Sequence, residues 1–556
     1  MNFLAKLLPL AAQLRSYSGG DLRSDLVAGL TTAVMLIPQG MAYAMLAGLP
    51  PIVGLYASTV PLVGYALFGS SRQLAVGPVA VLSLMTAASV GAIAETGTDA
   101  YLTYALILAL MVGVIQLVMG VARLGIVTNF LSHPVLSGFT SAAALIIAFS
   151  QFEPLVGPGF HTTTAIVGIA SLLFLLAVRV FKPSFPGMFF IVVISTAAVW
   201  ALGLDARGVE VVGDVPTGLP GLTLVPITWE VIETLLPAAV VIALVGFMES
   251  FAVAKKIAEG HGEEDDLEAN RELVGLGAAN IGAGLFGGYP VTGGFSRSAV
   301  NDRAGAKSNL AAVITAVAVV VTLLLLTDLF YYMPLAVLAA IIMTAIVGLI
   351  DLEAVKHLWQ VKRDGLAILV ITFLSTLLIG IEEGLAIGIG ASLLWFIIRS
   401  TRPHTAVLGR LPGTTSYRNL KRHPEAKTIP GLLVLRIDSQ FFFGNVSFLK
   451  DTLVKLEKQM DQPLQAVIID ASSINQLDSS AELALHKILE DYQQRDIELY
   501  FAKTKGPVLD VMRASKFFQD LGEKHFTYRV HQAVQKACKK CFDADDPGEL
   551  EQIQTR

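Results

Sequence analysis

The chain is poor in charge and almost free of cysteine. Only 15% of its 556 residues are charged, whereas soluble domains carry about a quarter. Together with 54% hydrophobic residues and a mean hydropathy of +0.64, this excludes an ordinary soluble protein. Cys538 and Cys541 are too few for a disulfide framework, and their Cys-Lys-Lys-Cys spacing lacks the second ligand pair of a zinc site. We expect two reduced cysteines on the surface of a helix.

Basic patches and catalytic constellations are also missing. The formal net charge is −5, and acids gather at 263–266 and near the C-terminus, so no nucleic-acid partner is indicated. No nucleophile and base stand at catalytic spacing, and Gly275-Leu276-Gly277 lies in an apolar run rather than after a soluble strand. We therefore expect neither an enzyme nor a resident cofactor. Residues 1–20 lack a cleavage site after a compact apolar core, so we expect the first apolar span to be retained.

Long uncharged runs dominate what is present. Runs such as 26–44, 100–122 and 334–350 can cross about 30 Å of hydrocarbon, and by length the chain contains about twelve full spans and two shorter ones. The stretch 399–427 holds seven basic residues and one acid, and basic residues also precede the first span. The positive-inside rule then predicts cytoplasmic N- and C-termini and an even number of crossings. We expect a multi-pass protein of the inner (cytoplasmic) membrane, with the lipid bilayer as its surroundings.

Composition shifts predict five segments along the chain. They are a lead-in (1–23), a transmembrane domain (24–400), a linker (401–429), a soluble α/β domain (430–545) and a tail (546–556). In the soluble block, strands are expected at 431–438, 465–470 and 497–502, and helices at 446–458 and 479–493.

The transmembrane domain divides into halves of about 24–205 and 230–400. Each half contains two spans, then a polar Gly- or Pro-containing stretch, and then a short helix. The order of elements, rather than sequence identity, indicates the repeat, and an odd number of spans per half would invert the second copy.

Two short helices interrupted by glycine lie at corresponding places of the halves. Gly77-Pro78-Val79 opens one, and the run from Gly293 to Ser298 opens the other. We predict Pro78 at the first helical position, where its missing N–H costs nothing. Helix N-termini carry roughly half a positive charge, so two facing ends would form an anion site. Ser296 and Ser298 could cap the helix or donate to the ligand, and Arg297 adds a permanent cation. A structural kink with Arg297 at the lipid headgroups is the alternative.

Three further polar residues stand in apolar spans. Glu249 lies one to two turns from the charged end of its helix, where it could take up a proton, hold sodium or neutralise Arg297; we favour the proton. Gln39 and Tyr43 are four residues apart and share a helix face. They either line a substrate cavity or pack at a kink made by Pro38.

These residues form motifs that closely resemble the signatures of the sulfate permease (SulP-type) anion transporters, relatives of prestin and pendrin. The motifs are 37–44 (IPQGMAYA), 47–56 (AGLPPIVGLY) and 287–301 (GGYPVTGGFSRSAVN). The resemblance implies fourteen spans in two inverted repeats of seven, core and gate domains, a homodimer and elevator-like transport. It also implies an acid at Glu249 associated with cation coupling, and substrate contacts at Gln39, Tyr43, Val79, Phe295, Ser296 and Arg297.

The C-terminal block resembles a STAS domain, the module shared with anti-sigma-factor antagonists. The run 468–480 matches its strand, loop and helix, and Ser480 occupies the position that is phosphorylated in the antagonists. Ala481 replaces the usual glycine, and Asp478 and Ser479 can instead simply cap the helix. Regulation, through Ser480 or a soluble partner, and dimer contact are the roles this resemblance implies.

The sequence thus predicts a secondary transporter of a small inorganic anion, with sulfate as the family's default. A dianion entering against 100 mV opposes about 4.6 kcal/mol, from roughly 2.3 kcal/mol per charge, so a co-transported proton or sodium ion is expected. Proton- or sodium-coupled transport of bicarbonate or a dicarboxylate is the alternative. An alternative of another class is a membrane sensor or scaffold that acts through the STAS domain.

Overall fold

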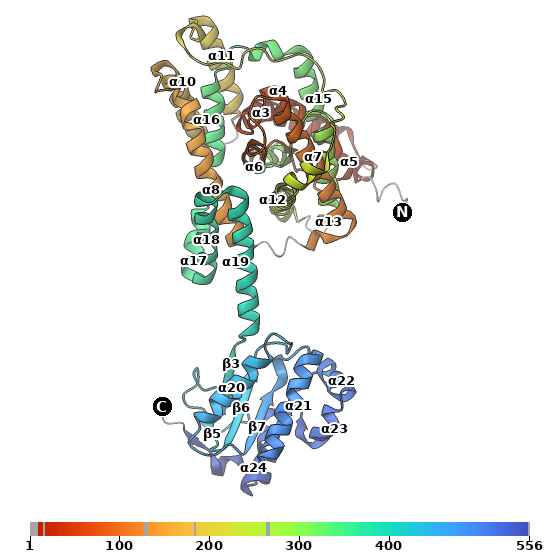
Figure 1. Cartoon of the computed structure of the whole chain (residues 1–556), viewed down its shortest axis with the longest axis vertical. Coiled ribbons are helices and arrows are strands. Elements are labelled where there is room, and N and C mark those ends of the chain that lie inside the picture. Colours follow the sequence, from red (N-terminus) through yellow and green to blue (C-terminus); the bar gives the residue numbers. More distant parts are fainter. Residues whose placement is uncertain (1–8, 15–16, 127–131, 183–184, 263–266, 554–556) are drawn as a thin grey trace. The chain divides into compact units, whose positions relative to one another are not determined.

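The computed structural model describes residues 9–14, 17–126, 132–182, 185–262 and 267–553 (Figure 1). Part of the predicted lead-in (1–8 and 15–16), the acidic run 263–266 and the last three residues of the tail lie outside these ranges. The chain forms two compact units, Met1–Ser392 and Leu393–Arg556, whose boundary falls within helix α19 (Ile381–Thr401).

The first unit is helical and contains two series of seven segments. Helices that directly continue one another are counted as one segment. The first series consists of α3 (Gly19–Leu46), α4 with α5 (Pro51–Tyr56, Val60–Phe68), α6 (Ala80–Gly91), α7 (Asp99–Val121), α8 with α9 (His133–Ser150, Phe152–Val156), α10 (Thr162–Phe181) and α11 (Gly187–Leu202). The second consists of α12 (Trp229–His261), α13 (Ala269–Leu285), α14 (Phe295–Arg303), α15 (Leu310–Leu325), α16 (Leu335–Ile346), α17 with α18 (Leu352–Val361, Arg363–Leu378) and α19.

Fewer of these segments are full-length helices than the apolar runs predicted. Within the described ranges, seven helical stretches are long and apolar enough to cross a membrane by length and composition. Others are shorter because the chain breaks within the apolar region: α6 has 12 residues and α14 has 9. A short helix leaves backbone groups unpaired at its ends, which is tolerated at membrane depth only inside protein or beside a cavity.

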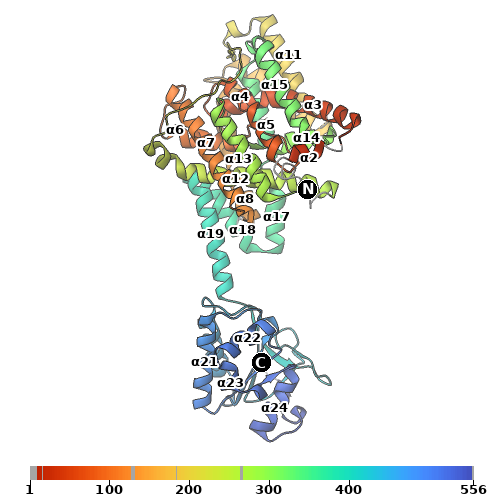
Figure 2. The ribbon, with the colours of Figure 1, turned by 90° about the vertical axis from the view of Figure 1, so that its right-hand side faces the viewer.

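Two packing groups can be distinguished in the first unit (Figures 1 and 2). In one, α13 packs against α7 and α5, α15 against α3, and α12 against α7. In the other, α8 packs against α18, and α10 and α9 pack against α16. We call α3–α7 with α12–α15 the core group, and α8–α11 with α16–α18 and the first half of α19 the gate group. The two short helices α6 and α14 both belong to the core group.

Small residues let the core helices approach closely. A Cβ atom added to Gly113 of α7 would lie 2.5 Å from the Ile281 amide nitrogen, and one added to Gly54 of α4 would lie 1.9 Å from the Gly40 carbonyl oxygen of α3. Such backbone contact is the usual way in which helices associate tightly in a membrane, where burial of apolar surface gives no driving force.

The second unit is a sheet covered by helices. Its strand order is β10-β5-β3-β6-β7-β8-β9, with β4 paired to β3. The predicted strands are observed as β6 (Leu432–Ile437), β7 (Ala466–Asp470) and β8 (Glu498–Ala502), which run parallel, and the predicted helices as α20 (Val446–Lys458) and α21 (Ser479–Gln494). The unit also contains α22 (Gly506–Ala514), α23 (Phe517–Leu521), β9 (Phe526–Thr527), α24 (Val530–Phe542) and β10 (Gln552–Ile553).

Three expectations for this unit need correction. Residues 401–429 are not only a linker, because β3 (Thr405–Arg410), β4 (Tyr417–Asn419) and β5 (Lys427–Thr428) pair into the sheet. The tail segment likewise contributes β10, which pairs with β5. Cys538 lies on α24, as expected, but it is fully buried in the core between α24 and the sheet. Burial raises the pKa of the Cys538 thiol to about 11.

Candidate functional site

The chain segments before α6 and α14 meet as a two-stranded antiparallel ladder. Strand β1 (Val76–Gly77) pairs with β2 (Thr292–Gly293), with Val76 opposite Gly293 and Gly77 opposite Thr292. The Gly294 amide also donates to the Ala75 carbonyl at 3.1 Å. This pairing satisfies backbone groups that would otherwise be bare at membrane depth. It also places the starts of the two short helices side by side.

The start of α6 differs slightly from the prediction. Val79 is the N-cap residue and the helix begins at Ala80, so Pro78 precedes the cap and is not the first helical residue. The reason is that Gly77 belongs to β1 and the extended chain continues through Val79. The prolyl carbonyl is thereby free to accept a hydrogen bond from the other half of the repeat.

That hydrogen bond comes from Arg297, in the first turn of α14. Its side chain is 2% exposed, and Nη1 donates to the Pro78 carbonyl at 2.6 Å. The other two nitrogens, Nε and Nη2, have no partner among the residues that the structure describes. Neither α6 nor α14 has a side-chain cap, so no side chain at the cap accepts from their first-turn N–H groups. These groups and the unpaired edge of the guanidinium lie together where the two helices begin. Both features favour an anion.

A cavity of about 880 Å³ opens beside these helix starts. All seven residues predicted for substrate binding and cation coupling line it: Gln39, Tyr43, Val79, Glu249, Phe295, Ser296 and Arg297. They come from α3, α6, α12 and α14, which all belong to the core group. The gate group closes the other side of the cavity with residues of α8, α10 and α16. The structure therefore brings the predicted site residues together.

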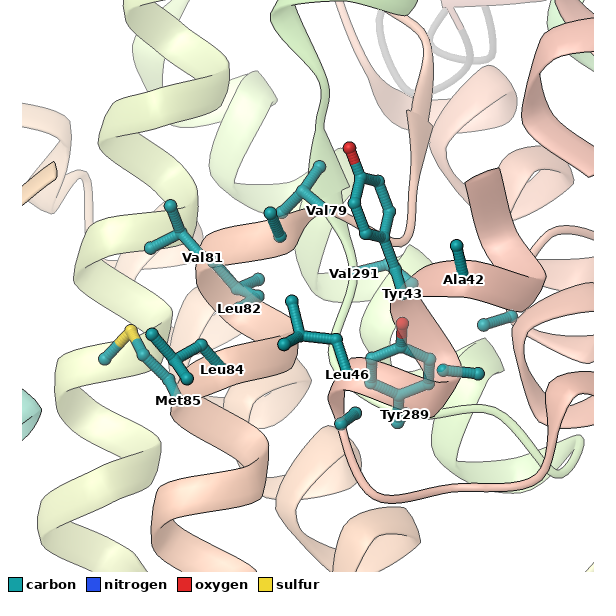
Figure 3. Close-up of a cluster of buried hydrophobic side chains, with 14 of the residues drawn as sticks. Ala42, Tyr43, Leu46, Val79, Val81, Leu82, Leu84, Met85, Tyr289 and Val291 are labelled. Atoms are coloured by element: carbon teal, nitrogen blue, oxygen red, sulfur yellow. The ribbon is translucent and has the colours of Figure 1, made fainter. Parts of the chain in front are cut away.

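Helix α3 contributes one wall of the cavity. Gln39 is 1% exposed, and its Oε1 has no partner among the described residues. Figure 3 shows the ring of Tyr43 beside Val79 at the start of α6. Thr31, Met35, Gln39 and Tyr43, spaced by four residues, all line the cavity, as one face of a helix would.

Glu249 lines the same cavity from α12. It is partly buried, and its Oε2 is fully covered without a partner among the described residues. Within that part of the chain it forms no direct ion pair with Arg297, whose Nε and Nη2 are likewise unpaired. Direct neutralisation of Arg297, one of the three interpretations of Glu249, is therefore not what the structure displays.

Phe295 and Ser296 lie on the open side of the α14 start. Phe295 is 53% exposed, and the Lys256 ammonium lies 5.2 Å from its ring centre. Ser296 is exposed towards the cavity. Ser298 is different, because its hydroxyl is fully buried and accepts a hydrogen bond from the Ala75 amide at 2.9 Å. Ser298 holds the two halves together and does not face the cavity.

Several buried polar residues that position the site were missed from the sequence. Asn280 of α13 donates to the Val291 carbonyl at 3.0 Å and accepts from the Val291 amide at 2.8 Å. Ser250 of α12 accepts from the Gly293 amide at 2.6 Å. Glu272 of α13 accepts hydrogen bonds from Tyr65, Ser70 and Ser71, which anchors the polar hairpin before β1. A polar residue inside an apolar helix was the available signal.

The Gly294→Ala variant should disturb the anion site without unfolding the protein. A Cβ atom at Gly294 would lie 2.9 Å from Arg297 Nη2, so the guanidinium must shift by a few tenths of an ångström. We expect anion binding to weaken by roughly tenfold, the worth of one charge-assisted hydrogen bond. Titration of purified protein measures this. The matched variant Gly390→Ala, where a Cβ atom meets open space, should bind as the parent does, and equal binding by both variants would contradict the prediction.

In the second unit, Ser480 is exposed in the first turn of α21. Asp478 caps this helix, accepting from the Ala481 amide at 2.8 Å and from the Phe443 amide at 2.8 Å. The capping role proposed for Asp478 is therefore observed. A regulatory role of Ser480 stays a prediction.

Two short helices begin beside one buried arginine, after an antiparallel pair of strands, within two series of seven segments. This arrangement defines a membrane transport protein with interrupted helices. The chain belongs to the sulfate permease family, whose model matches residues 22–163 and 158–372; a STAS domain model matches 423–537.

Known proteins resemble the chain over almost its whole length. Sulfate transporter 4.1, chloroplastic, of Arabidopsis thaliana is 39% identical over 96% of this chain and 83% of its own length. High affinity sulfate transporter 2 of Stylosanthes hamata is 32% identical over 96% and 86%. The solved structure of the murine Slc26a9 anion transporter matches with a TM-score of 0.89 at 24% identity, over 96% of this chain and 94% of that one. This last likeness concerns the fold.

Proposed function

We propose that the protein is a proton-coupled symporter that imports an inorganic oxyanion, with sulfate as the substrate. The observation that carries the proposal is the buried Arg297 with its unpaired Nε and Nη2. These two N–H groups form one edge of a planar fork, which matches two oxygens of an oxyanion. The sulfate transporters that are 32–39% identical over most of the chain support sulfate as the first anion to test.

Proton coupling is proposed from Glu249. A carboxylate at a water-facing cavity inside a membrane is costly when charged and unpaired, and its Oε2 has no partner among the described residues. Uptake of a proton would remove that cost, and it would also offset part of the charge carried inward with sulfate. Because a dianion opposes about 4.6 kcal/mol at 100 mV, uncoupled uptake would face a concentration ratio of roughly three orders of magnitude.

Movement of the core group against the gate group is the proposed transport step. Arg297, Glu249, Gln39 and Tyr43 all stand on core helices, while the gate group supplies only the facing wall. A shift of the core as a unit would carry the site across the membrane and leave its internal hydrogen bonds intact. The inner-membrane location, the cytoplasmic termini and the homodimer stay predictions, as does a regulatory partner at the STAS domain.

Uptake into proteoliposomes tests this function. Labelled sulfate, bicarbonate and fumarate are offered separately, with an imposed inward proton or sodium gradient. We expect sulfate to accumulate under the proton gradient. Accumulation of another anion alone would replace the substrate, and accumulation under sodium alone would replace the coupling ion. Binding without any uptake would favour the sensor or scaffold.

A further inference from the structure

Besides Glu249, the transmembrane unit contains another carboxyl group of interest, that of Glu382. It forms a hydrogen bond between the gate group and the core group, away from the anion site. Glu382, in the first turn of α19, forms a hydrogen bond through Oε1 with the hydroxyl of Ser89 near the end of α6. The same hydroxyl lies 2.7 Å from the Met85 carbonyl oxygen in its own helix. Glu382 is partly buried, so it does not simply face water at the membrane surface, as acids near span ends usually do.

The hydroxyl of Ser89 has one hydrogen and two acceptor neighbours. It can donate to Met85 or to Glu382, but not to both. If Glu382 is ionised, the Met85 carbonyl loses this bond, because a carboxylate has no hydrogen to give. If Glu382 is protonated, its O–H donates to Ser89 and Ser89 donates to Met85, so every group is satisfied. A chain of this kind is mutually reinforcing.

The contact lies on the far side of the anion site from the cavity. Helix α6 begins at the site, where Val79, Ala80 and Val81 line the cavity, and Ser89 is ten residues further on. At 1.5 Å per residue this is about 15 Å along the helix. The Ser89–Glu382 bond therefore ties the core group to the gate group at a distance from the cavity.

Among the residues that the structure describes, one charged group acts on Glu382. Glu383 follows it on the same helix and is the charged neighbour that acts on it. The element facing it across the contact, α6, presents the uncharged Ser89. Helix α18 packs on α19 at Gly384 through Thr376, and Ser375 donates to the Gly384 carbonyl at 3.2 Å. An ionised Glu382 would thus stand beside a second carboxylate with no cation from these elements.

We propose that Glu382 is a second proton-binding residue, and that its protonated form holds α6 against α19 and keeps the far side shut. After the proton is released, Ser89 can still donate to Glu382, but the Met85 carbonyl is then left without its bond and the carboxylate stands beside Glu383 without a counter-charge among the described residues. Hydration of the ionised carboxylate by water on that side then competes with the contact and allows the core to move. Glu382 is then a positioning residue of the transport cycle, because it does not touch the anion. The inference rests on the proposed alternating movement of core and gate, but it requires neither sulfate nor Glu249.

We call the hydrogen bond between Ser89 and protonated Glu382 the latch. Anion exchange at equal pH on both membrane faces tests it, since no gradient then drives uptake. In the parent protein, exchange of labelled for unlabelled sulfate should slow as the buffer changes from mildly alkaline to mildly acidic. The Glu382→Gln variant cannot ionise but can still donate to Ser89. We expect its exchange to be slow at every pH, by roughly tenfold relative to the alkaline parent, the effect of one retained hydrogen bond. Ser89→Ala removes the latch and should exchange fast at every pH.

The matched control is Glu383→Gln, the same change one residue along the helix, which should keep the pH dependence of the parent. Sulfate affinity, measured by titration, should be unaltered in all three variants because none lines the cavity. A Glu382→Gln protein with the pH profile of the parent would overturn the latch, and so would an equal effect of Glu383→Gln. Absence of exchange in the parent itself would instead refute the proposed transport function.

Discussion

The Arg297→Ala variant should lose sulfate binding by at least roughly a hundredfold, because two hydrogen bonds from a charged donor disappear together. The guanidinium is the cation at the meeting point of α6 and α14, and Nε and Nη2 are its unpaired donors. Alanine removes them and leaves only helix N-termini, each worth about half a charge. Equilibrium titration of detergent-purified protein with labelled sulfate measures the loss, and uptake should fall in parallel.

Two further variants separate the possible causes of such a loss. Arg297→Lys keeps a charge but not the planar fork, so its affinity should lie between those of the parent and the alanine variant. Arg271→Ala removes an arginine that forms an ion pair with Glu268 at 3.0 Å outside the cavity, and it should bind normally. Thermal unfolding should show that Arg297→Ala is still folded, although it loses the bond to Pro78. Unchanged sulfate affinity in that folded variant would remove Arg297 from the site.

The site could be predicted from the sequence to the extent that its chemistry is local. Gly77, Gly293 and Gly294 interrupt apolar runs, and an arginine beside such a break is costly unless it serves a ligand. The sequence motifs around Gln39 and Arg297 indicated the protein family. These are features of consecutive residues, and the structure places them around one cavity.

The supporting contacts could not be predicted, because they join residues far apart in the chain. Nothing in the sequence near Ser298 indicates that its hydroxyl accepts from the Ala75 amide, so the sequence offered only a helix cap or a ligand donor for it. Glu382 and Ser89 likewise form a hydrogen bond although they are 293 residues apart in the chain. Strands β3, β4 and β5 were missed from the sequence for the same reason. Such short strands are held by hydrogen bonds to a neighbouring strand, and the local sequence does not show which strand that is.

The positions of Glu249 and Arg297 suggest that anion binding and proton binding occur at separate residues of the core group. Both line one cavity, yet they form no direct ion pair within the described chain. If they were paired, each would block the other, because the anion would have to compete with a carboxylate for Arg297. Kept apart, the arginine can bind the anion while the acid changes its protonation state. This separation leads to the second large expected effect.

The Glu249→Gln variant should lose proton-driven sulfate accumulation almost completely but retain sulfate exchange. Glutamine has the same shape and fills the same place on α12, but it cannot release or take up a proton. Binding and movement of the core should persist because Arg297 is intact. Only the link between the proton gradient and the anion gradient is removed. Two measurements on one proteoliposome preparation test this: accumulation under an inward proton gradient, and exchange of internal for external sulfate.

The control for this variant lies on the same helix. Glu259 is paired with Lys255 at 3.9 Å near the end of α12 and does not line the cavity. Glu259→Gln should therefore accumulate sulfate as the parent does. If Glu249→Gln accumulates sulfate as well as Glu259→Gln under the proton gradient, Glu249 is not the coupling residue. If Glu249→Gln loses exchange as well as accumulation, the acid is needed for core movement or binding itself, and coupling cannot be its separate role. Retained exchange with lost accumulation is the one pattern that assigns the proton to Glu249.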